Sequence, residues 1–513
     1  MRIAVNEPVF IPELLAPAGN PEKLRACLLY GADAVYLGGR SGNLRAACEG
    51  FDRAELEKGV AEANALGSRI YYCLNSLARE DDLASLPASI EEAASSGVHG
   101  FIIADPGVLR LARRYAPGVP VHLSTQANTS NSASAAFWAD QGVSRVNLAR
   151  ELSARDIHAI RKAVPELELE VFVHGAMCLA VSGQCLLSAW LNGRSGNQGR
   201  CTQPCRFEYR AMGLQPPGDA ARGPGAACPD DARVFAEGAP GLDAAVSAPG
   251  AALVVDEFTR PGEVVWFAGQ EDRYSSFWAP QDLCLLPWLS WFSANRVTAL
   301  KIEGRMKSAG WLAHVVDAYR VALDALRETD DVAHEPGPAF HPAAHGLNAL
   351  PGARSGPGGG TGSETGGRGI KERLRDACMA EVLYPATRPL GTGFFLHNRR
   401  RNFTEELLAA GMASRPNRSG ESRLPRLGRR LLARVIEPAG LGVWRIEAHG
   451  NWKRDMDVEL MLPGLRRPVL VGGSYGLENQ RGELAGSIGN GNRGLLYSDM
   501  PGIVPGIFIR AAE

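Results

Sequence analysis

The chain has 513 residues, a formal net charge of -1 and 45% hydrophobic residues. Because one hydrophobic core rarely grows beyond roughly 250–300 residues, this length predicts a large domain and at least one smaller one. The near-neutral charge excludes a general attraction to polyanions, so nucleic-acid contacts must come from local basic patches. The N-terminus does not resemble a signal peptide, and no stretch approaches the roughly 18 apolar residues of a membrane span. We therefore expect a cytoplasmic protein without membrane contact.

Short apolar runs alternate with helical patterns through the first 330 residues. Segments between the runs, such as 21–32, place apolar residues at helical spacing. Apolar runs separated by helices indicate parallel strands that helices cover, which predicts an α/β fold. Eight such strands predict a (β/α)8 TIM-like barrel, regular or distorted. An open doubly wound sheet is the alternative, but the first strand is not followed by a Gly-x-Gly-x-x-Gly turn. The expected strands are 13–19, 34–39, 69–77, 100–107, 121–128, 145–151, 169–175 and 299–305.

Polar residues recur at the carboxyl ends of these predicted strands. In a barrel all of these ends share one rim, where active sites lie, although each residue alone also fits an ordinary loop entry. The residues concerned are Asn75, Asp105, Gln126, Asn128, Arg150, His174, Glu303 and Arg305.

Composition changes divide the chain into four parts. Residues 1–330 form the predicted catalytic domain, with an Ala-, Gly- and Pro-rich insertion at about 211–252. A Gly- and Pro-rich linker at 331–378 leads to a connecting segment at 379–428. From 429 to 513, short strands separated by Gly and Pro turns predict a small all-β barrel domain.

Four cysteines fall within a single short segment, at Cys178, Cys185, Cys201 and Cys205. Clustered thiolates select zinc or an iron–sulfur cluster, because sulfur is a soft ligand. The six-residue gap between the first two is wide for a zinc site, whose cysteine pairs are usually two to four residues apart, so iron–sulfur is favoured. The spacing also allows Cys284 to replace Cys205 as the fourth ligand. A purely structural metal site is the alternative to a reactive one.

The same segment is rich in glycine and arginine. The run NGRSGNQGR leaves backbone N–H groups free to bind sulfur or an anionic ligand. Arg194, Arg200 and Arg206 add fixed positive charge suited to phosphate or carboxylate groups.

Four stretches of this sequence resemble the collagenase-like peptidase superfamily, of the peptidase U32 type. They are ELLAPAGNPEKLRACLLYGADAVYLGG, HLSTQANTSN, VFVHGAMCLAVSGQCLLSAWLNGRSGNQGRCTQPCRFEY and LKIEGRMKS. Within that superfamily, RPGEVV, QDLCLL and the TGFF segment before the β domain look most like the prephenate-dependent tRNA uridine hydroxylases. The resemblance covers about residues 12–210, 257–330 and 380–513, and departs from the family in the insertions at 211–252 and 335–369.

The resemblance implies a [4Fe-4S] cluster on Cys178, Cys185 and Cys201, with Cys205 favoured over Cys284 as the fourth ligand. It also implies hydroxylation of a tRNA wobble uridine at C5, with prephenate as co-substrate. Whether an electron-donor protein is a further partner is left open by the sequence. For the catalytic residues we expect Arg305 to bind carboxylate or phosphate, and His174 or Glu303 to move protons. Expected substrate-binding residues are Arg200, Arg206, Gln126, Asn128 and Lys301.

Three other functions compete with tRNA hydroxylation. The first is hydroxylation of a ribosomal RNA cytidine by an enzyme of the same superfamily. The second is proteolysis, although the chain lacks a His-Glu-x-x-His motif and a Gly-x-Ser-x-Gly elbow. The third is a non-enzymatic iron–sulfur partner subunit. For RNA binding, the densest basic stretch is Arg399–Arg401 with the arginines from Arg415 to Arg430, and a solvated linker is its alternative interpretation.

Overall fold

The computed structural model describes residues 9–40, 50–206, 253–257, 260–268, 281–327, 368–386, 388, 390–396 and 431–512. Two compact units divide the chain, one formed by Met1–Thr202 with Gln281–Glu513 and the other by Gln203–Pro280. The predicted insertion at 211–252, residues 331–367 of the predicted linker and the basic stretch from Arg399 to Arg430 lie outside the described residues. Within the described ranges, no helix is both long and apolar enough to cross a membrane.

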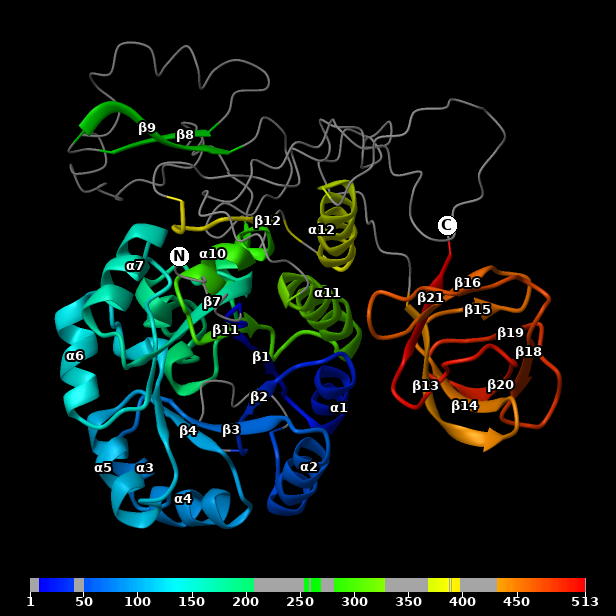
Figure 1. Ribbon diagram of the computed structural model, residues 1–513, viewed down its shortest axis with the longest axis horizontal. Coiled ribbons are helices and arrows are strands. Elements are labelled where there is room, and N and C mark those ends of the chain that lie inside the picture. The colour runs from blue at the N-terminus through cyan, green and yellow to red at the C-terminus, as the bar shows by residue number, and fades with distance from the viewer. Residues whose placement is uncertain are drawn as a thin grey trace, which may run out of the picture. The chain divides into compact units, whose positions relative to one another are not determined.

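Eight parallel strands close into a barrel in the first unit (Figure 1). Each strand from β1 to β6 pairs with the next, β7 pairs with β11, and β11 pairs with β1, which closes the circle. All eight overlap the strands predicted from the sequence, so the (β/α)8 prediction is confirmed. The strands are β1 (Glu13–Pro17), β2 (Ala34–Leu37), β3 (Arg69–Leu74), β4 (Gly100–Ile103), β5 (Val121–Leu123), β6 (Arg145–Asn147), β7 (Glu168–Ala176) and β11 (Ala299–Glu303).

Helices follow the strands and cover the outside of the barrel. Side-chain caps fix where several of them begin: Asn20 accepts a hydrogen bond from the Lys23 amide, and Asp105 accepts one from the Val108 amide, each 3.0 Å long. Asp105 at the end of a strand is thus a helix cap. The helices are α1 (Pro21–Leu29), α2 (Arg53–Ala65), α3 (Glu80–Leu83), α4 (Leu86–Ser95), α5 (Pro106–Tyr115), α6 (Ser132–Asp140), α7 (Ala154–Ala163), α10 (Leu289–Ala294) and α11 (Ala309–Arg327).

Successive side chains along each barrel strand point alternately toward the covering helices and into the barrel lumen. Leu14 and Ala16 face the helices and belong to the large outer core. Leu15, between them, belongs with Tyr36 and Tyr71 to a small cluster inside the barrel. Residues in register with Leu15 therefore line the barrel lumen, and their neighbours in sequence pack against the helices.

Further elements extend the barrel sheet after β7. Strand β10 (Asp282–Cys284) pairs antiparallel with the end of β7, and β12 (Leu390–Gly391) pairs with β10. Helix α12 (Arg368–Leu383) crosses the predicted boundary at residue 378, and its Met379 and Val382 join the outer core. The second unit contains an antiparallel hairpin of β8 (Leu253–Glu257) and β9 (Arg260–Ala268), which includes the RPGEVV motif.

The C-terminal residues form the predicted small β domain, which begins at Leu431. Its main sheet is antiparallel and runs in the order β17-β16-β21-β13-β14-β20-β18, with β15 and β19 as a separate pair. The described strands include no pairing between the two ends of this sheet, β17 and β18. The strands are β13 (Leu431–Gly440), β14 (Val443–Ala448), β15 (Trp452–Lys453), β16 (Val458–Met461), β17 (Val469–Leu470), β18 (Gly476–Asn479), β19 (Ser487–Ile488), β20 (Arg493–Tyr497) and β21 (Phe508–Ala511).

A buried carboxylate joins α11 to the β domain. Asp317 accepts hydrogen bonds from the backbone amides of Gly464 (2.7 Å) and Leu465 (3.1 Å) and from the Arg467 guanidinium (2.7 Å). Since three donors surround it, Asp317 is satisfied at a place where its desolvation alone would be costly.

Candidate active site and metal centre

Residues 177–202, here called the cysteine segment, are fastened to the loops at the carboxyl ends of three barrel strands. After β3, the Leu77 amide donates to the Asn197 carbonyl (2.8 Å). After β5, the Gln126 carbonyl accepts from the Gln184 side chain (2.6 Å). The third attachment, after β6, is the Glu151 carboxylate described below. The segment therefore lies at the barrel rim, where active sites of this fold occur.

Glu151 clamps the turn between the first two cysteines. Its two carboxylate oxygens accept from the backbone amide (2.7 Å) and the hydroxyl (2.9 Å) of Ser182. Ser182 is buried and has a φ of 44°, a left-handed conformation that costs free energy in a residue with a side chain. The clamp holds that conformation in place. Glu151 was missed in the sequence, where its only sign is its position directly after Arg150 at a strand end.

Three of the four predicted cysteine ligands lie in the cysteine segment, and two of them, Cys185 and Cys201, lie close to each other there. Burial raises the pKa of the Cys185 thiol, and the nearby Cys178 and Cys201 raise it further. A Cβ placed on Gly196 would lie 3.5 Å from Cys201 Cβ and 3.7 Å from the Cys185 carbonyl oxygen, so these two cysteines flank one glycine. The Leu187 amide donates to Cys185 Sγ over 3.4 Å.

Thiol sulfurs are soft donors, and by their chemistry they suit zinc or an iron–sulfur cluster. Among the described residues, no three His, Cys, Asp or Glu side chains are grouped so that they could hold one metal ion. Amide donors to sulfur, like that of Leu187 to Cys185, stabilise thiolate ligands and tune a cluster.

The two candidates for the fourth ligand have different surroundings. Cys205 is buried and belongs to the second compact unit. Cys284 is fully buried in the outer core, with its Sγ 4.0 Å from the Tyr319 hydroxyl, and burial raises its pKa to about 11. A thiol held in the outer core is poorly suited to become a thiolate ligand at the rim.

An ion pair lies at the mouth of the barrel beneath the cysteine segment. The Arg150 guanidinium donates to Glu303 Oε2 (3.0 Å) and to the Ala176 carbonyl (3.1 Å), and it lies 3.9 Å from the centre of the Phe172 ring. Both charged side chains are largely but not completely buried, at 10% and 13% exposure. Glu303 therefore combines a fixed position with access from the mouth, as a proton-transferring group requires.

Gly175 allows β7 and β11 to meet beside this pair. Its φ is 104°, and a Cβ there would lie 2.1 Å from the Glu303 carbonyl oxygen. The position of Glu303 thus depends on the absence of a side chain at residue 175.

Lys301 lies deeper in the lumen, where its ammonium group is paired with a carboxylate and lies over an aromatic ring. It is in register with Leu15, its ammonium donates to Glu170 over 2.7 Å, and it lies 4.4 Å from the centre of the Tyr36 ring. Glu170 also faces the buried Arg145. A substrate that reached Lys301 would have to displace this pair, so the geometry favours a structural role for Lys301 over the predicted substrate contact.

His174 points away from the mouth. Its ring faces the rings of Trp311 and Tyr319 in α11, with centroids 5.6 and 5.5 Å apart, and its Nδ1 lies 3.4 Å from the Tyr319 hydroxyl. Burial lowers the pKa of His174 to about 3, with a smaller effect from Lys307, so the ring is neutral near pH 7. Of the two predicted proton-moving groups, the structure places only Glu303 at the mouth.

The remaining predicted residues occupy different depths. Gln126 is half-buried beneath the cysteine segment, and a Cβ on Gly183 would lie 2.8 Å from its amide nitrogen. Asn128 has a φ of 56°, and its buried Oδ1 has no hydrogen-bond partner among the described residues. Arg305 is buried beside Cys73, whereas Arg200 is exposed. Arg206 lies in the second unit, and its side chain is outside the described residues.

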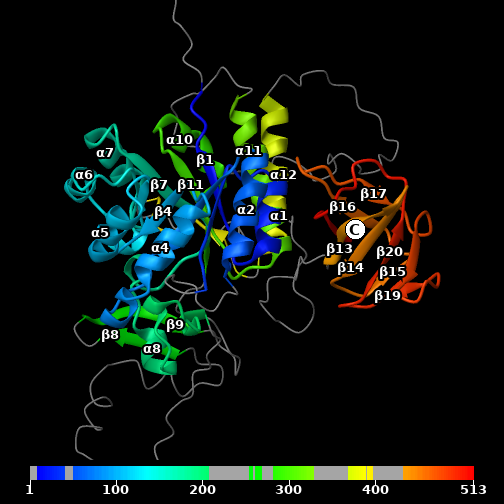
Figure 2. The same ribbon diagram turned by 90° about the horizontal axis from the view of Figure 1, so that it is seen from below.

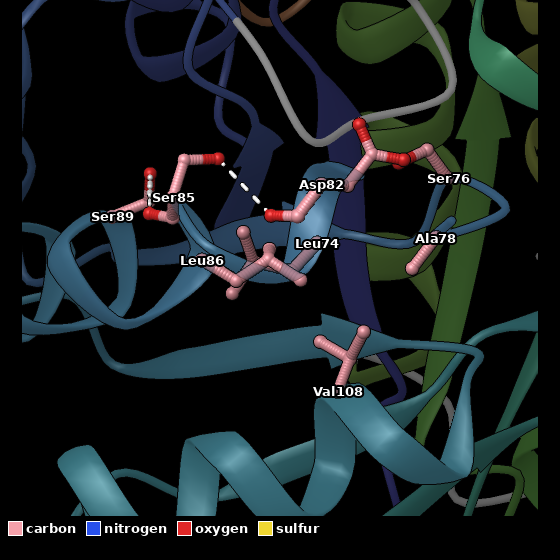
Figure 3. Close-up of a pocket in the computed structure, with 8 residues that line it drawn as sticks. All are labelled: Leu74, Ser76, Ala78, Asp82, Ser85, Leu86, Ser89 and Val108. Atoms are coloured by element: carbon pink, nitrogen blue, oxygen red, sulfur yellow. Dashed lines mark hydrogen bonds between the residues drawn. The ribbon is translucent and has the colours of Figure 1, made fainter. Parts of the chain in front are cut away.

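A small pocket beside the rim is not a nucleotide site. Figure 3 shows its lining of serine hydroxyls, one carboxylate and apolar side chains. A volume of about 40 Å³ holds one or two waters and is far below that of a ligand pocket. The lining residues are Leu74, Ser76, Ala78, Asp82, Ser85, Leu86, Ser89 and Val108.

Fold and site together define a (β/α)8-barrel protein with a cysteine-bearing segment fastened over the carboxyl ends of its strands. A protein-family comparison assigns it further: the model of peptidase family U32 matches residues 19–344, and the chain belongs to this family.

Relatives with curated names point to RNA hydroxylation and to proteolysis. "tRNA hydroxylation protein P" of Escherichia coli (strain K12) is 36% identical over 331 residues, which cover 62% of this chain and 68% of that protein. "23S rRNA 5-hydroxycytidine C2501 synthase" of the same strain is 39% identical over 199 residues, 38% of this chain and 29% of that protein. "Collagenase" of Porphyromonas gingivalis is 33% identical over 208 residues, 38% of this chain and 50% of that protein.

Proposed function

We propose that this chain is an RNA hydroxylase, and more specifically that it hydroxylates the wobble uridine of tRNA at C5. The observation that carries the proposal is the 36% identity over 331 residues to a tRNA hydroxylation protein, since this match is much longer than those to the ribosomal RNA synthase and the collagenase. The cysteine segment over the barrel mouth supports it, because sulfur ligands there suit redox chemistry better than peptide hydrolysis.

In this proposal Cys178, Cys185 and Cys201, with Cys205 as the fourth ligand, hold a [4Fe-4S] cluster. When bound, such a cluster supplies one-electron redox chemistry. The backbone amide of Leu187 steadies the Cys185 sulfur, and Glu151 fixes the turn that separates Cys178 from Cys185.

The chain's own residues hold the substrate and move its protons. Glu303 is the group placed to accept a proton from the bound substrate, and Arg150 keeps that carboxylate oriented toward the mouth. Arg200, exposed on the cysteine segment, contacts phosphate, and the buried Arg305 holds a carboxylate of prephenate as co-substrate. An electron-donor protein is the expected further partner.

Nucleoside mass spectrometry tests the proposal. tRNA is analysed from a bacterial host that lacks wobble-uridine hydroxylation and expresses this protein, its Cys178→Ala variant or its Cys284→Ser variant. We expect 5-hydroxyuridine derivatives with the wild type and with Cys284→Ser, and none with Cys178→Ala. If folded wild-type protein restores none, the tRNA assignment is wrong, and ribosomal RNA from the same cells shows whether a cytidine is hydroxylated instead.

A proteolytic role is tested on the same protein. Digestion of collagen or casein by metal-free wild type, lost in Cys178→Ala, would favour a cysteine peptidase over a hydroxylase.

A further inference from the structure

The short helix α8 (Leu187–Asn192), inside the cysteine segment, turns an apolar face to solvent. Trp190 is 83% exposed, Leu186 75% and Leu191 52%. Leu186 and Trp190 are four residues apart, so they lie on the same face of the helical turn. Large apolar side chains gathered in this way on a surface usually mark a binding site. Figure 2 labels α8 at one end of the barrel.

The polar face of the same helix is the buried one, which fixes its orientation. Ser188 is fully buried; its hydroxyl donates to the Arg194 carbonyl (2.7 Å) and accepts from the Thr202 amide (3.0 Å). These bonds join α8 to the glycine-rich run and to the residue after Cys201. Trp190 is therefore held outward by a buried hydrogen-bond network.

The sequence around Trp190 carries positive charge without acidic residues. Residues 174–206 contain three arginines and no Asp or Glu, although the whole chain has 56 acidic residues. Arg194 and Arg200 are both exposed. An aromatic platform beside fixed cations is the combination that binds single-stranded nucleic acid, whose bases stack while its phosphates pair.

This surface directly adjoins the proposed reaction site. Helix α8 begins two residues after Cys185, and the Leu187 amide donates to the Cys185 sulfur (3.4 Å). A base that enters an active site must leave its stack, and its neighbours then lose a stacking partner.

We infer that Trp190 stacks on an unpaired base of an RNA loop next to the base that reacts, and that Arg194 and Arg200 bind the adjoining phosphates. This inference rests on the proposed function, because it names how the same site holds its RNA.

Binding measurements on the full chain with its metal content intact test the inference. The probe is a fluorescein-labelled tRNA anticodon stem-loop with an unmodified wobble uridine, titrated at several salt concentrations. Trp190→Ala should weaken binding roughly 5- to 150-fold, the range for loss of one base–aromatic stack, and Trp190→Phe should retain most of the affinity. Arg194→Gln should reduce the slope of log affinity against log salt by about one phosphate contact.

Phe137→Ala is the matched control, because Phe137 is another exposed aromatic, 54% exposed, on the outer helix α6. It should change RNA affinity less than twofold. Equal losses for Phe137→Ala and Trp190→Ala overturn the inference, and so does unchanged affinity of Trp190→Ala. A lower melting temperature of Trp190→Ala with unchanged affinity shows that the indole packs against protein, and it also overturns the inference.

Mass spectrometry of the tRNA separates this inference from the proposed function. If the wild type hydroxylates tRNA but Trp190→Ala binds normally, the stacking surface is wrong and the activity stands. If the wild type does not hydroxylate tRNA but Trp190→Ala loses affinity selectively, the surface stands and the assigned reaction is wrong.

Discussion

Replacing Gly175 with alanine should destabilise the barrel at its closure and disturb the candidate active site. Gly175 has a φ of 104°, and a Cβ there would lie 2.1 Å from the Glu303 carbonyl oxygen, where real Cβ atoms stay beyond 3.0 Å. Because that oxygen belongs to the backbone of β11, no side-chain rotation can relieve the clash. Strands β7 and β11 must move apart, and Glu303 moves with them.

Two costs add up in this variant. A non-glycine residue in such a backbone conformation costs about 1–3 kcal/mol, and overpacking of a tight contact costs about 1–3 kcal/mol more. Their sum centres on roughly 4 kcal/mol, a large part of the 5–15 kcal/mol by which native proteins are typically stable. At about 2–4 °C per kcal/mol, the melting temperature should fall by roughly 10 °C.

Gly67→Ala provides the control, because Gly67 has a φ of 71° but nothing within 4 Å of its Cβ position. It should cost only about 1–2 kcal/mol of backbone strain, or roughly 4 °C. Thermal melts followed by near-UV circular dichroism compare the two variants with wild type. Equal shifts for both variants, or a Gly175→Ala shift below the control's, would refute the predicted contact between β7 and β11.

Three further outcomes are expected. Cys185→Ala should lose bound iron in a colorimetric assay, whereas Cys284→Ser should keep it because Cys284 lies in the outer core; loss of iron in both would make Cys284 a ligand. The pKa of His174 is about 3 in the folded protein and about 6.5 in the unfolded chain. Between these pH values the unfolded chain binds more protons, so the free energy of unfolding falls as pH drops from 6.5 toward 3. Denaturant melts of His174→Gln should show a pH slope shallower by up to about 1.4 kcal/mol per pH unit in that window, and an unchanged slope would mean that the imidazole is accessible to protons. Asp317→Ala removes the acceptor of two backbone amides and one of the two carboxylates that Arg467 contacts, the other being Glu381, and should cost about 3–5 kcal/mol. Hydrogen exchange should be faster at the Gly464 and Leu465 amides, and exchange at the wild-type rate contradicts the junction.

The strand order of the barrel was predictable because it depends on local patterns. A buried parallel strand requires a short, nearly continuous apolar run, and each covering helix requires apolar residues at a period of 3.6. Both patterns can be read from residues close together in the sequence. All eight predicted strands overlap observed ones. The helix at Arg368–Leu383 was missed, because a Gly-rich stretch precedes it and its stability comes from packing against α11.

The candidate site was predictable only in part. The spacing of Cys178, Cys185 and Cys201 marks them as a group, and the structure places Cys185 and Cys201 beside the same glycine, Gly196. The direction in which a side chain points was not predictable at the end of β7. A register shift between Lys301 and Ile302 puts His174 opposite Ile302, and its ring turns toward α11 while Glu303 stays at the mouth.

The sequence by itself determined the barrel, the all-β character of the C-terminal domain and the grouping of the cysteines, since each depends on residue type at a fixed spacing along the chain. Only the tertiary structure decided that Glu151 clamps the cysteine segment, that Lys301 is engaged by Glu170 and that Trp190 faces solvent beside Cys185. Glu151 and Ser182, like Lys301 and Glu170, come from different strands and loops, and contacts between residues far apart in the chain form only when the barrel closes.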